Sequence, residues 1–125
     1  MQVYKNPSCD CCAAWVHYLK AAGFSVEVTE TEDTIAVRRR LGMPDRFGSC
    51  HTATVEGYVL EGHVPSFEVK RLLAMKPAAI GLAVPAMPVG SPGMEYGDRK
   101  DPYDVFLIDR KGHATVFARY PKSAT

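Results

Sequence analysis

The sequence has little imbalance of charge and no long apolar stretch. Its 125 residues include 15 lysines and arginines against 14 aspartates and glutamates, which gives a formal net charge of +1. A protein that binds the phosphate backbone of nucleic acids normally has a strongly basic surface, so this balance argues against a nucleic-acid partner. No apolar run approaches the ~20 residues that a membrane span requires. We therefore expect neither nucleic-acid binding nor a membrane span.

The chain also lacks the spread of cysteines that is typical of a secreted domain held together by disulfides. Of its four cysteines, Cys9, Cys11 and Cys12 fall in the run SCDCC, and Cys50 lies far away in SCHTA. A structural framework distributes its cysteines so that they tie distant loops together, which three thiols on one turn cannot do. A chain of this length buries about two-thirds of its surface without help from disulfides. The crowding favours metal binding or thiol redox chemistry.

Apolar periodicity and turn residues predict the order β-α-β-α-β-β-α over the first part of the chain. The predicted strands cover residues 3–4 and 24–28 and two segments within 52–61, and the predicted helices cover residues 10–22, 35–41 and 67–75. This is the order of the thioredoxin/glutaredoxin core, which places a thiol motif between the first strand and the first helix. Residues 9–12 fall at that place. The opening residues MQVYKNPSC already predict a strand, and no signal peptide is recognisable there.

The rest of the chain is predicted to be an addition to that core. Residues 77–102 are rich in proline, glycine and methionine, and so long a loop in a compact domain is usually functional or disordered. Its apolar residues favour packing against the core. Residues 105–108 and 115–118 predict a β-hairpin that turns at residues 109–112. We expect residues 1–125 to form one α/β domain: a thioredoxin/glutaredoxin-like core with a long loop insertion and a C-terminal β-hairpin.

The spacing of the thiols suggests how they could act. Cys9 and Cys12 have C-x-x-C spacing, with Cys11 between them. At the N-terminus of a helix, free N–H groups and the helix dipole favour a thiolate over a thiol. In the predicted fold, the loop before the third strand packs beside this turn and usually carries a cis-proline. Cys50 and His51 occupy about that place here, so the fourth thiol would face the other three.

Four convergent thiolates would form a soft metal site. Soft sulfur donors select Cu(I), zinc or iron–sulfur clusters. Zinc sites normally draw two pairs of ligands from separate knuckles, which the adjacent Cys11 and Cys12 do not suit, whereas adjacent cysteines can bridge several Cu(I) ions. Further candidate ligands are two imidazoles and two thioethers: His51, His63, Met87 and Met94.

The same residues allow other interpretations. A C-x-x-C motif on this fold is more often a redox disulfide than a metal site, which leaves open a thiol–disulfide oxidoreductase without stable metal and with Cys9 as its nucleophile. The missing cis-proline argues against it, because that residue helps such enzymes hold a substrate. Cys50 could be a small buried hydrophobic residue, and His51 and His63 could be hydrogen-bonded structural residues. The third alternative, a structural zinc domain, predicts that a chelator unfolds the protein.

Several motifs together resemble the CopG family of copper-resistance proteins of Gram-negative bacteria. They are YKNPSCDCC, GSCHTA, GY-x-x-EGHVP, GLAVP-x-MP-x-GSPGME and YDV, and they run from about Val3 to Val105. This is a thioredoxin-like family formerly of unknown function. A weaker likeness to arsenate reductases, at the level of the fold, rests on YKNPSC alone.

The resemblance implies a periplasmic protein of copper-resistance systems, made with a signal peptide that is not recognisable in this chain. It implies that Cys9, Cys11, Cys12 and Cys50 hold copper as a cysteine-bridged multinuclear Cu(I) cluster. It further implies cycling between thiol and disulfide forms that interconverts Cu(I) and Cu(II), a copper oxidoreductase activity that the residues alone leave undecided. The expected partners are copper ions and other periplasmic copper-resistance proteins.

Overall fold

One seven-stranded sheet organises residues 1–121, the part of the chain that the computed structural model describes. Its strands are β1 (Gln2–Lys5), β2 (Glu27–Glu30), β3 (His51–Val55), β4 (Tyr58–Glu61), β5 (Ala79–Ala83), β6 (Tyr103–Asp109) and β7 (Ala114–Tyr120). They lie side by side in the order β2-β1-β3-β4-β5-β6-β7. The pairs β1–β2 and β4–β5 are parallel, and the other neighbours are antiparallel.

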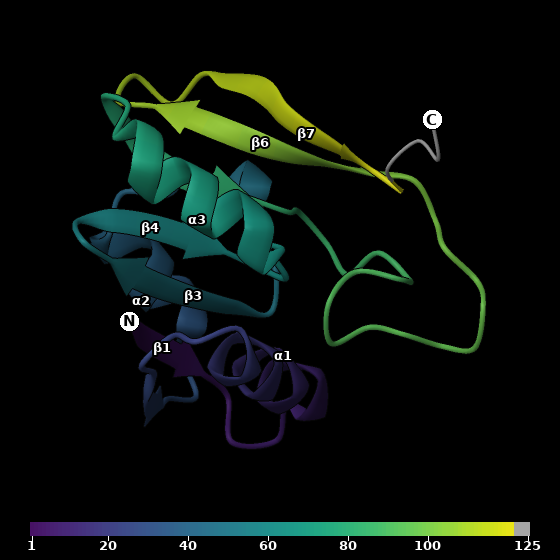
Figure 1. The fold of residues 1–125 in the computed structure, drawn as a ribbon. Helices are drawn as coiled ribbons and strands as arrows, with labels where there is room; N and C mark the ends of the chain where they lie inside the picture. The colour runs from purple at the N-terminus through teal and green to yellow at the C-terminus, as the bar shows by residue number, and fades with distance from the viewer. Residues whose placement is uncertain (122–125) are drawn as a thin grey trace.

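Within residues 1–121, three α-helices and one short 3-10 helix connect these strands. They are α1 (Asp10–Ala21), α2 (Thr34–Arg40), η1 (Asp45–Phe47) and α3 (Ser66–Met75). Figure 1 shows α3 in front of the sheet and α2 behind it. The order of strands and α-helices up to the end of α3 is the predicted one. In the described part of the chain, no helix combines the length and the apolar character that spanning a bilayer requires.

Apolar side chains form two clusters, one on each face of the sheet. The larger contains Trp15 and Leu19 of α1 together with Leu72 of α3, and all three are fully buried. Successive residues of a strand point to opposite faces, and in β4 Leu60 accordingly belongs to the larger cluster while Val59 belongs to the smaller one. The buried members of the smaller cluster are Met43, Phe47, Val59, Ala83 and Ile108.

Residues 77–102 do not form one long loop as predicted, because residues 79–83 form β5. This strand pairs with β4 and with β6, and it thereby joins the C-terminal hairpin to the rest of the sheet. A Cβ atom at Gly81 would lie 1.7 Å from the carbonyl oxygen of Val59, so only glycine allows this approach of β5 to β4. Glycine inside a strand and proline near its ends weaken the strand pattern in a sequence, which explains the error.

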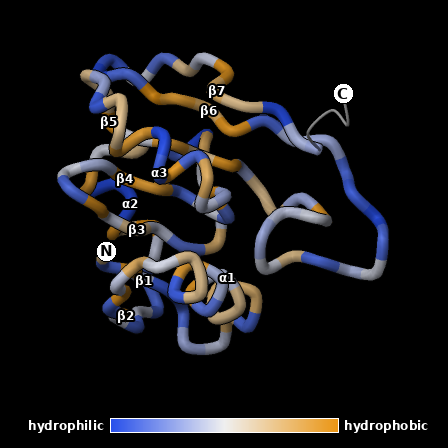
Figure 2. The backbone as a smooth tube through the Cα atoms, viewed as in Figure 1, coloured by the Kyte–Doolittle hydropathy of each residue, from blue (hydrophilic) through white to orange (hydrophobic). Residues whose placement is uncertain are grey.

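The remaining loop, residues 84–102, extends from β5 to β6 at the side of the sheet (Figure 1). The stretch that leads into β6 is hydrophilic, whereas β6 contains apolar segments (Figure 2). The predicted C-terminal hairpin is confirmed as β6 and β7, which pair from Tyr103 opposite Tyr120 to Ile108 opposite Ala114. The hairpin therefore extends the sheet rather than standing apart from it.

Most predicted boundaries differ from the structure by one to three residues. Strand β2 begins at Glu27 rather than at residue 24, and its four residues are exposed. The apolar side chains of Phe24 and Val26 pack against the core before the strand begins, and they produced the alternation seen in the sequence. Helix α2 begins at Thr34, one residue before the predicted start. Its N-cap is Asp33, whose Oδ1 accepts a hydrogen bond from the backbone N–H of Ala36 at 3.0 Å.

Candidate metal centre

Three cysteines lie at the N-terminus of α1. Cys9 is the N-cap residue, and its Sγ accepts a hydrogen bond from the backbone N–H of Cys12 at 3.3 Å. Cys9 and Cys12 are joined by a disulfide, so the structure shows this pair in its oxidised form, while Cys11 is a free thiol. Cys12 is fully buried, whereas Cys9 and Cys11 are partly exposed.

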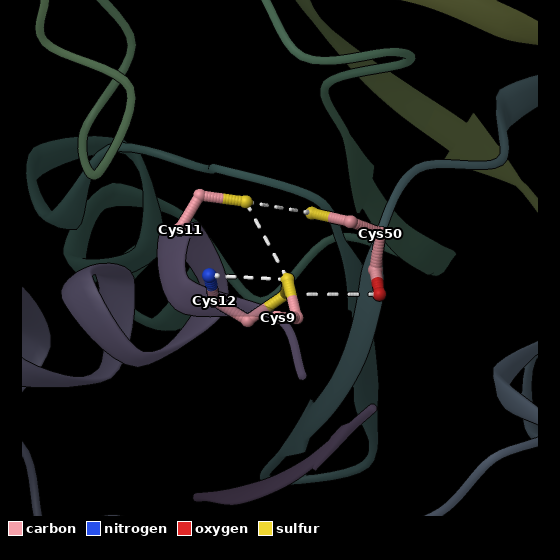
Figure 3. Close-up of side chains that lie close together, drawn as sticks. All are labelled: Cys9, Cys11, Cys12 and Cys50. Atoms are coloured by element: carbon pink, nitrogen blue, oxygen red, sulfur yellow. Dashed lines mark hydrogen bonds between the residues drawn. A yellow bond between two sulfur atoms is a disulfide. The ribbon is translucent and has the colours of Figure 1, made fainter. Parts of the chain in front are cut away.

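Cys50 reaches this turn from the neighbouring strand. It immediately precedes β3, and β3 pairs antiparallel with β1, the strand that leads into α1. Sγ of Cys11 lies 3.9 Å from Sγ of Cys50 and 3.4 Å from Sγ of Cys9 (Figure 3). All four sulfur atoms lie within 4.8 Å of one another. The structure thus brings the four predicted cysteines together, and their role as metal ligands stays a prediction.

Burial keeps Cys50 protonated in this arrangement. Desolvation, together with the neighbouring Cys11 thiol, raises the pKa of Cys50 to about 12. At neutral pH Cys50 is therefore a thiol in the metal-free protein. A metal ion that binds its sulfur must displace a proton.

Two fully buried histidines face the sulfur of Cys50. Nδ1 of His51 lies 3.3 Å from it and Nε2 of His63 lies 3.1 Å from it. The other nitrogen of each ring contacts a backbone carbonyl oxygen, that of Gly62 at 2.8 Å for His51 and that of Pro92 at 2.6 Å for His63. A carbonyl oxygen can only accept a hydrogen bond, so in each neutral ring the nitrogen nearer the sulfur presents a lone pair. Burial lowers the pKa of both rings, that of His51 to about 3.

A buried carboxylate holds the segment that carries Cys50. Oε2 of Glu61 accepts a hydrogen bond from the backbone N–H of Ser49 at 2.7 Å, and Oε1 accepts one from the hydroxyl of Thr52 at 2.5 Å. Nη1 of the buried Arg38 lies 3.6 Å from Oε2. Burial raises the pKa of Glu61, although these neighbours favour its charged form. No local pattern indicates this role, because one glutamate in a strand is usually exposed to solvent.

The loop of residues 84–102 lies against the cysteines and the first turn of α1. Sδ of Met87, a half-exposed residue, lies 3.9 Å from Sγ of Cys11. Farther along, Gly93 has a φ of +91°, and a Cβ atom there would lie 2.9 Å from the carbonyl oxygen of Cys11 and 3.0 Å from the backbone nitrogen of Trp15. Glycine at this position therefore allows the loop to rest on the first turn of α1.

The two methionines of the loop, which the sequence could not distinguish, have different surroundings. In residues 1–121, the thioether sulfur that contacts a cysteine sulfur belongs to Met87. Met94 is buried, its backbone N–H donates to the carbonyl oxygen of Ser91, and its own carbonyl oxygen accepts from the N–H of Gly90. Met94 thus closes a turn of the loop.

Two solved structures are similar to this chain over almost its full length. One, described as copper resistance protein CopG in form 2, is 46% identical, has a TM-score of 0.91, and covers 96% of each chain. The other, described as form 1 of that protein, is 45% identical, has a TM-score of 0.91, and covers 97% of this chain and 96% of that one. A family model described as a protein of unknown function, DUF411, matches residues 47–94. No curated protein matches the sequence.

Proposed function

The chain belongs to the family of the copper resistance protein CopG, and from this premise we propose that it binds copper through its four cysteines and contributes to copper resistance. The proposed cargo is a multinuclear cluster of Cu(I) ions bridged by the thiolates of Cys9, Cys11, Cys12 and Cys50. The observation that carries the proposal is the convergence of the four Sγ atoms within 4.8 Å.

The donor atoms around this group suit copper. In residues 1–121, the clusters of side chains that could hold a metal contain only cysteine and histidine, and carboxylates take no part. Thiolate and thioether sulfurs prefer soft ions such as Cu(I), and imidazole also suits copper. Beyond the four thiols, Met87 adds a thioether beside Cys11, and His51 and His63 add lone pairs beside Cys50. Adjacent thiols on one helical turn favour ions bridged by sulfur over a single tetrahedral zinc ion.

The proposed domain is thioredoxin-like and comprises the whole chain, residues 1–125. The succession β1-α1-β2-α2-β3-β4-α3 supports this assignment, as does the sheet order β2-β1-β3-β4 with β1 parallel to β2 and antiparallel to β3. A helix N-terminus stabilises negative charge on sulfur, which is the electrostatic setting that a thiolate site needs. Strands β5 to β7 and the loop of residues 84–102 are the proposed additions.

The proposed redox chemistry uses the disulfide that the structure contains. Reduction of the Cys9–Cys12 bond consumes two electrons and two protons and yields two thiols. In the opposite direction, two Cu(II) ions each accept one electron from the two thiols, which leaves two Cu(I) ions, one disulfide and two protons in solvent. Interconversion of Cu(I) and Cu(II) in this way would be a copper oxidoreductase activity. The proposed location is the periplasm, and the proposed partners besides copper ions are other copper-resistance proteins there.

The test is an anaerobic titration of the fully reduced protein with Cu(I), in which bound metal per chain is measured with and without excess zinc. The proposal predicts more than one tightly held Cu(I) per chain that zinc does not displace, and fewer in the Cys50→Ser variant. One weakly held or zinc-exchangeable ion would refute the cluster.

A second candidate function is thiol–disulfide exchange without a lasting metal. The closed Cys9–Cys12 pair with the partly exposed Cys9 favours it. This alternative predicts that the copper-free protein catalyses the reduction of insulin by dithiothreitol and that Cys9→Ser abolishes the catalysis. If the protein binds copper but has no exchange activity, neither the wild type nor Cys9→Ser will accelerate the reduction of insulin.

A further inference from the structure

The two cysteines outside the disulfide lie beside each other. Cys11 and Cys50 are free and partly exposed, and their Sγ atoms are 3.9 Å apart (Figure 3). We propose that Cys11 and Cys50 form a second disulfide, so that the four thiols give up four electrons when they close into two disulfide bonds.

The separation of the two sulfur atoms is short enough for this bond. The two sulfur atoms are 3.9 Å apart, and a disulfide bond is about 2.05 Å long. To form the bond, the two side chains must therefore bring their sulfur atoms closer by slightly less than about 2 Å. The backbone beside Cys50 is already fixed, because the N–H of Ser49 donates to Glu61 and the hydroxyl of Ser49 donates to the carbonyl oxygen of Ala86. The contact therefore belongs to an ordered segment.

The pairing of the other two cysteines explains why Cys11 is left for Cys50. Residues three positions apart on a helical turn lie on one face, whereas residues two positions apart do not. Cys9 and Cys12 are three positions apart and are bonded. Cys11 is only 3.4 Å from Cys9, but a Cys9–Cys11 bond would join residues two positions apart and would leave the buried Cys12 as a thiol. The arrangement of Cys9–Cys12 with Cys11–Cys50 uses all four sulfurs.

The balance of the reaction follows from the two bonds. Oxidation of the thiols of Cys11 and Cys50 releases two electrons and two protons, as oxidation of the thiols of Cys9 and Cys12 does. With Cu(II) as oxidant, four thiols reduce four Cu(II) ions to Cu(I) and give two disulfides and four protons. This coupling to copper rests on the proposed function, whereas the second disulfide does not. Closing both bonds leaves no thiolate to hold Cu(I), so full oxidation would release the cargo.

The test uses the full-length, copper-free protein and diamide, which accepts two electrons and two protons per disulfide formed. The reduced protein is oxidised at low concentration, denatured, alkylated with N-ethylmaleimide and weighed by mass spectrometry. We expect a monomer with no alkylated cysteine, and a tryptic product in which peptides 6–20 and 47–70 are linked. The Cys11→Ser and Cys50→Ser variants should each retain one alkylated thiol per chain and show no link between those peptides.

Three results would overturn the proposal. They are two alkylated thiols per wild-type chain, a disulfide-linked dimer in place of the closed monomer, or a link between peptides 6–20 and 47–70 in Cys11→Ser. Since no copper is present, these results leave the proposed copper binding untouched, and the Cu(I) titration in turn does not depend on the second disulfide.

Discussion

Nε2 of His63 lies 3.1 Å from the sulfur of Cys50. The hydrogen bond from Nδ1 to the carbonyl oxygen of Pro92 fixes which nitrogen carries the hydrogen, so a lone pair faces the thiol. The two contacts of His63 therefore link three separate segments: the residues that lead into β3, the turn before α3 and the loop of residues 84–102. Of the side-chain atoms that contact the sulfur of Cys50 in the described structure, this nitrogen lies nearest, so His63 would be placed to help hold copper beside Cys50.

Replacing His63 by alanine should weaken copper binding. Loss of the nitrogen beside the proposed copper site is expected to lower Cu(I) retention roughly tenfold. This is the lower end of the loss in metal affinity that follows mutation of residues supporting metal ligands. His17, which is exposed on α1, offers a control on the same protein. The measurement is competition with a Cu(I)-specific chelator. Equal retention by wild type, His63→Ala and His17→Ala would show that His63 has no part in the site.

Gly93→Ala should lift the loop from α1. The added Cβ atom would lie within 3.0 Å of backbone atoms of Cys11 and Trp15, and the residue would keep a positive φ. Gly97→Ala is the matched control, because Gly97 also has a positive φ of +59° but no neighbour within 4 Å of an added Cβ atom. Both variants bear the cost of a left-handed alanine, about 1–2 kcal/mol.

Chemical denaturation measures the free energy of unfolding of the two glycine variants. We expect Gly93→Ala to be the less stable and to bind less Cu(I). Equal losses of stability with unchanged copper stoichiometry would show that the approach of the loop to α1 does not matter.

Glu61→Ala should be strongly destabilising, because it leaves the buried guanidinium of Arg38 without its buried partner. Removing one member of a buried ion pair costs about 3–5 kcal/mol. The Asp101→Asn variant breaks the exposed pair with Arg99 at 3.1 Å and should cost about 1 kcal/mol or less. Urea denaturation of the copper-free proteins gives both values. A loss below 1 kcal/mol for Glu61→Ala would contradict the structural role assigned to this carboxylate.

The copper-free protein should lose stability as the pH falls from 6.5 to 5. The buried His51 has a pKa of about 3, against 6.5 for an ordinary histidine, so in this range the unfolded chain binds a proton that the folded protein does not. The free energy of unfolding then decreases on acidification, by up to about 1.4 kcal/mol per pH unit for each such histidine. The Asp45 and Asp109 carboxyls have lowered pKa values, so they do not titrate in this range. Burial raises the pKa of Glu61, which acts in the opposite direction, so the contribution of His51 is obtained by comparing wild type with a His51 variant.

The check on this pH dependence is urea denaturation at pH 6.5, 5.75 and 5 for wild type and for His51→Gln, in which the amide can still donate to Gly62. The slope of the free energy of unfolding against pH should be smaller in the variant. The difference should be up to about 1.4 kcal/mol per pH unit, which corresponds to one proton. Identical slopes would mean that His51 binds as many protons in the folded protein as in the unfolded chain, and would contradict the lowered pKa.

The sequence was a good guide to the cysteines and a poor one to their surroundings. Spacing alone places Cys9, Cys11 and Cys12 on one helical turn, and the predicted order of elements brings Cys50 to it. The role of Glu61 depends on partners nine and twelve positions away in the chain, Thr52 and Ser49, which no local pattern indicates. The same holds for β5, whose close approach to β4 requires the glycine that weakens its strand pattern.

The two loop methionines illustrate a second limit. Met87 and Met94 both lie in a stretch rich in proline and glycine, so composition gives them the same prediction. Only the path of the loop, which places one thioether beside Cys11 and buries the other, separates them.

The central claim is that sulfur atoms of the four cysteines bridge several copper ions. X-ray absorption at the copper K-edge, measured on the anaerobically loaded protein, tests it most directly because the spectrum reports the oxidation state, the ligand atoms and any neighbouring metal. We predict a Cu(I) edge, a first shell dominated by sulfur, and a copper–copper scattering term that disappears in Cys50→Ser. A first shell of nitrogen and oxygen, or a sulfur shell with no copper–copper term in the wild type, would contradict the account.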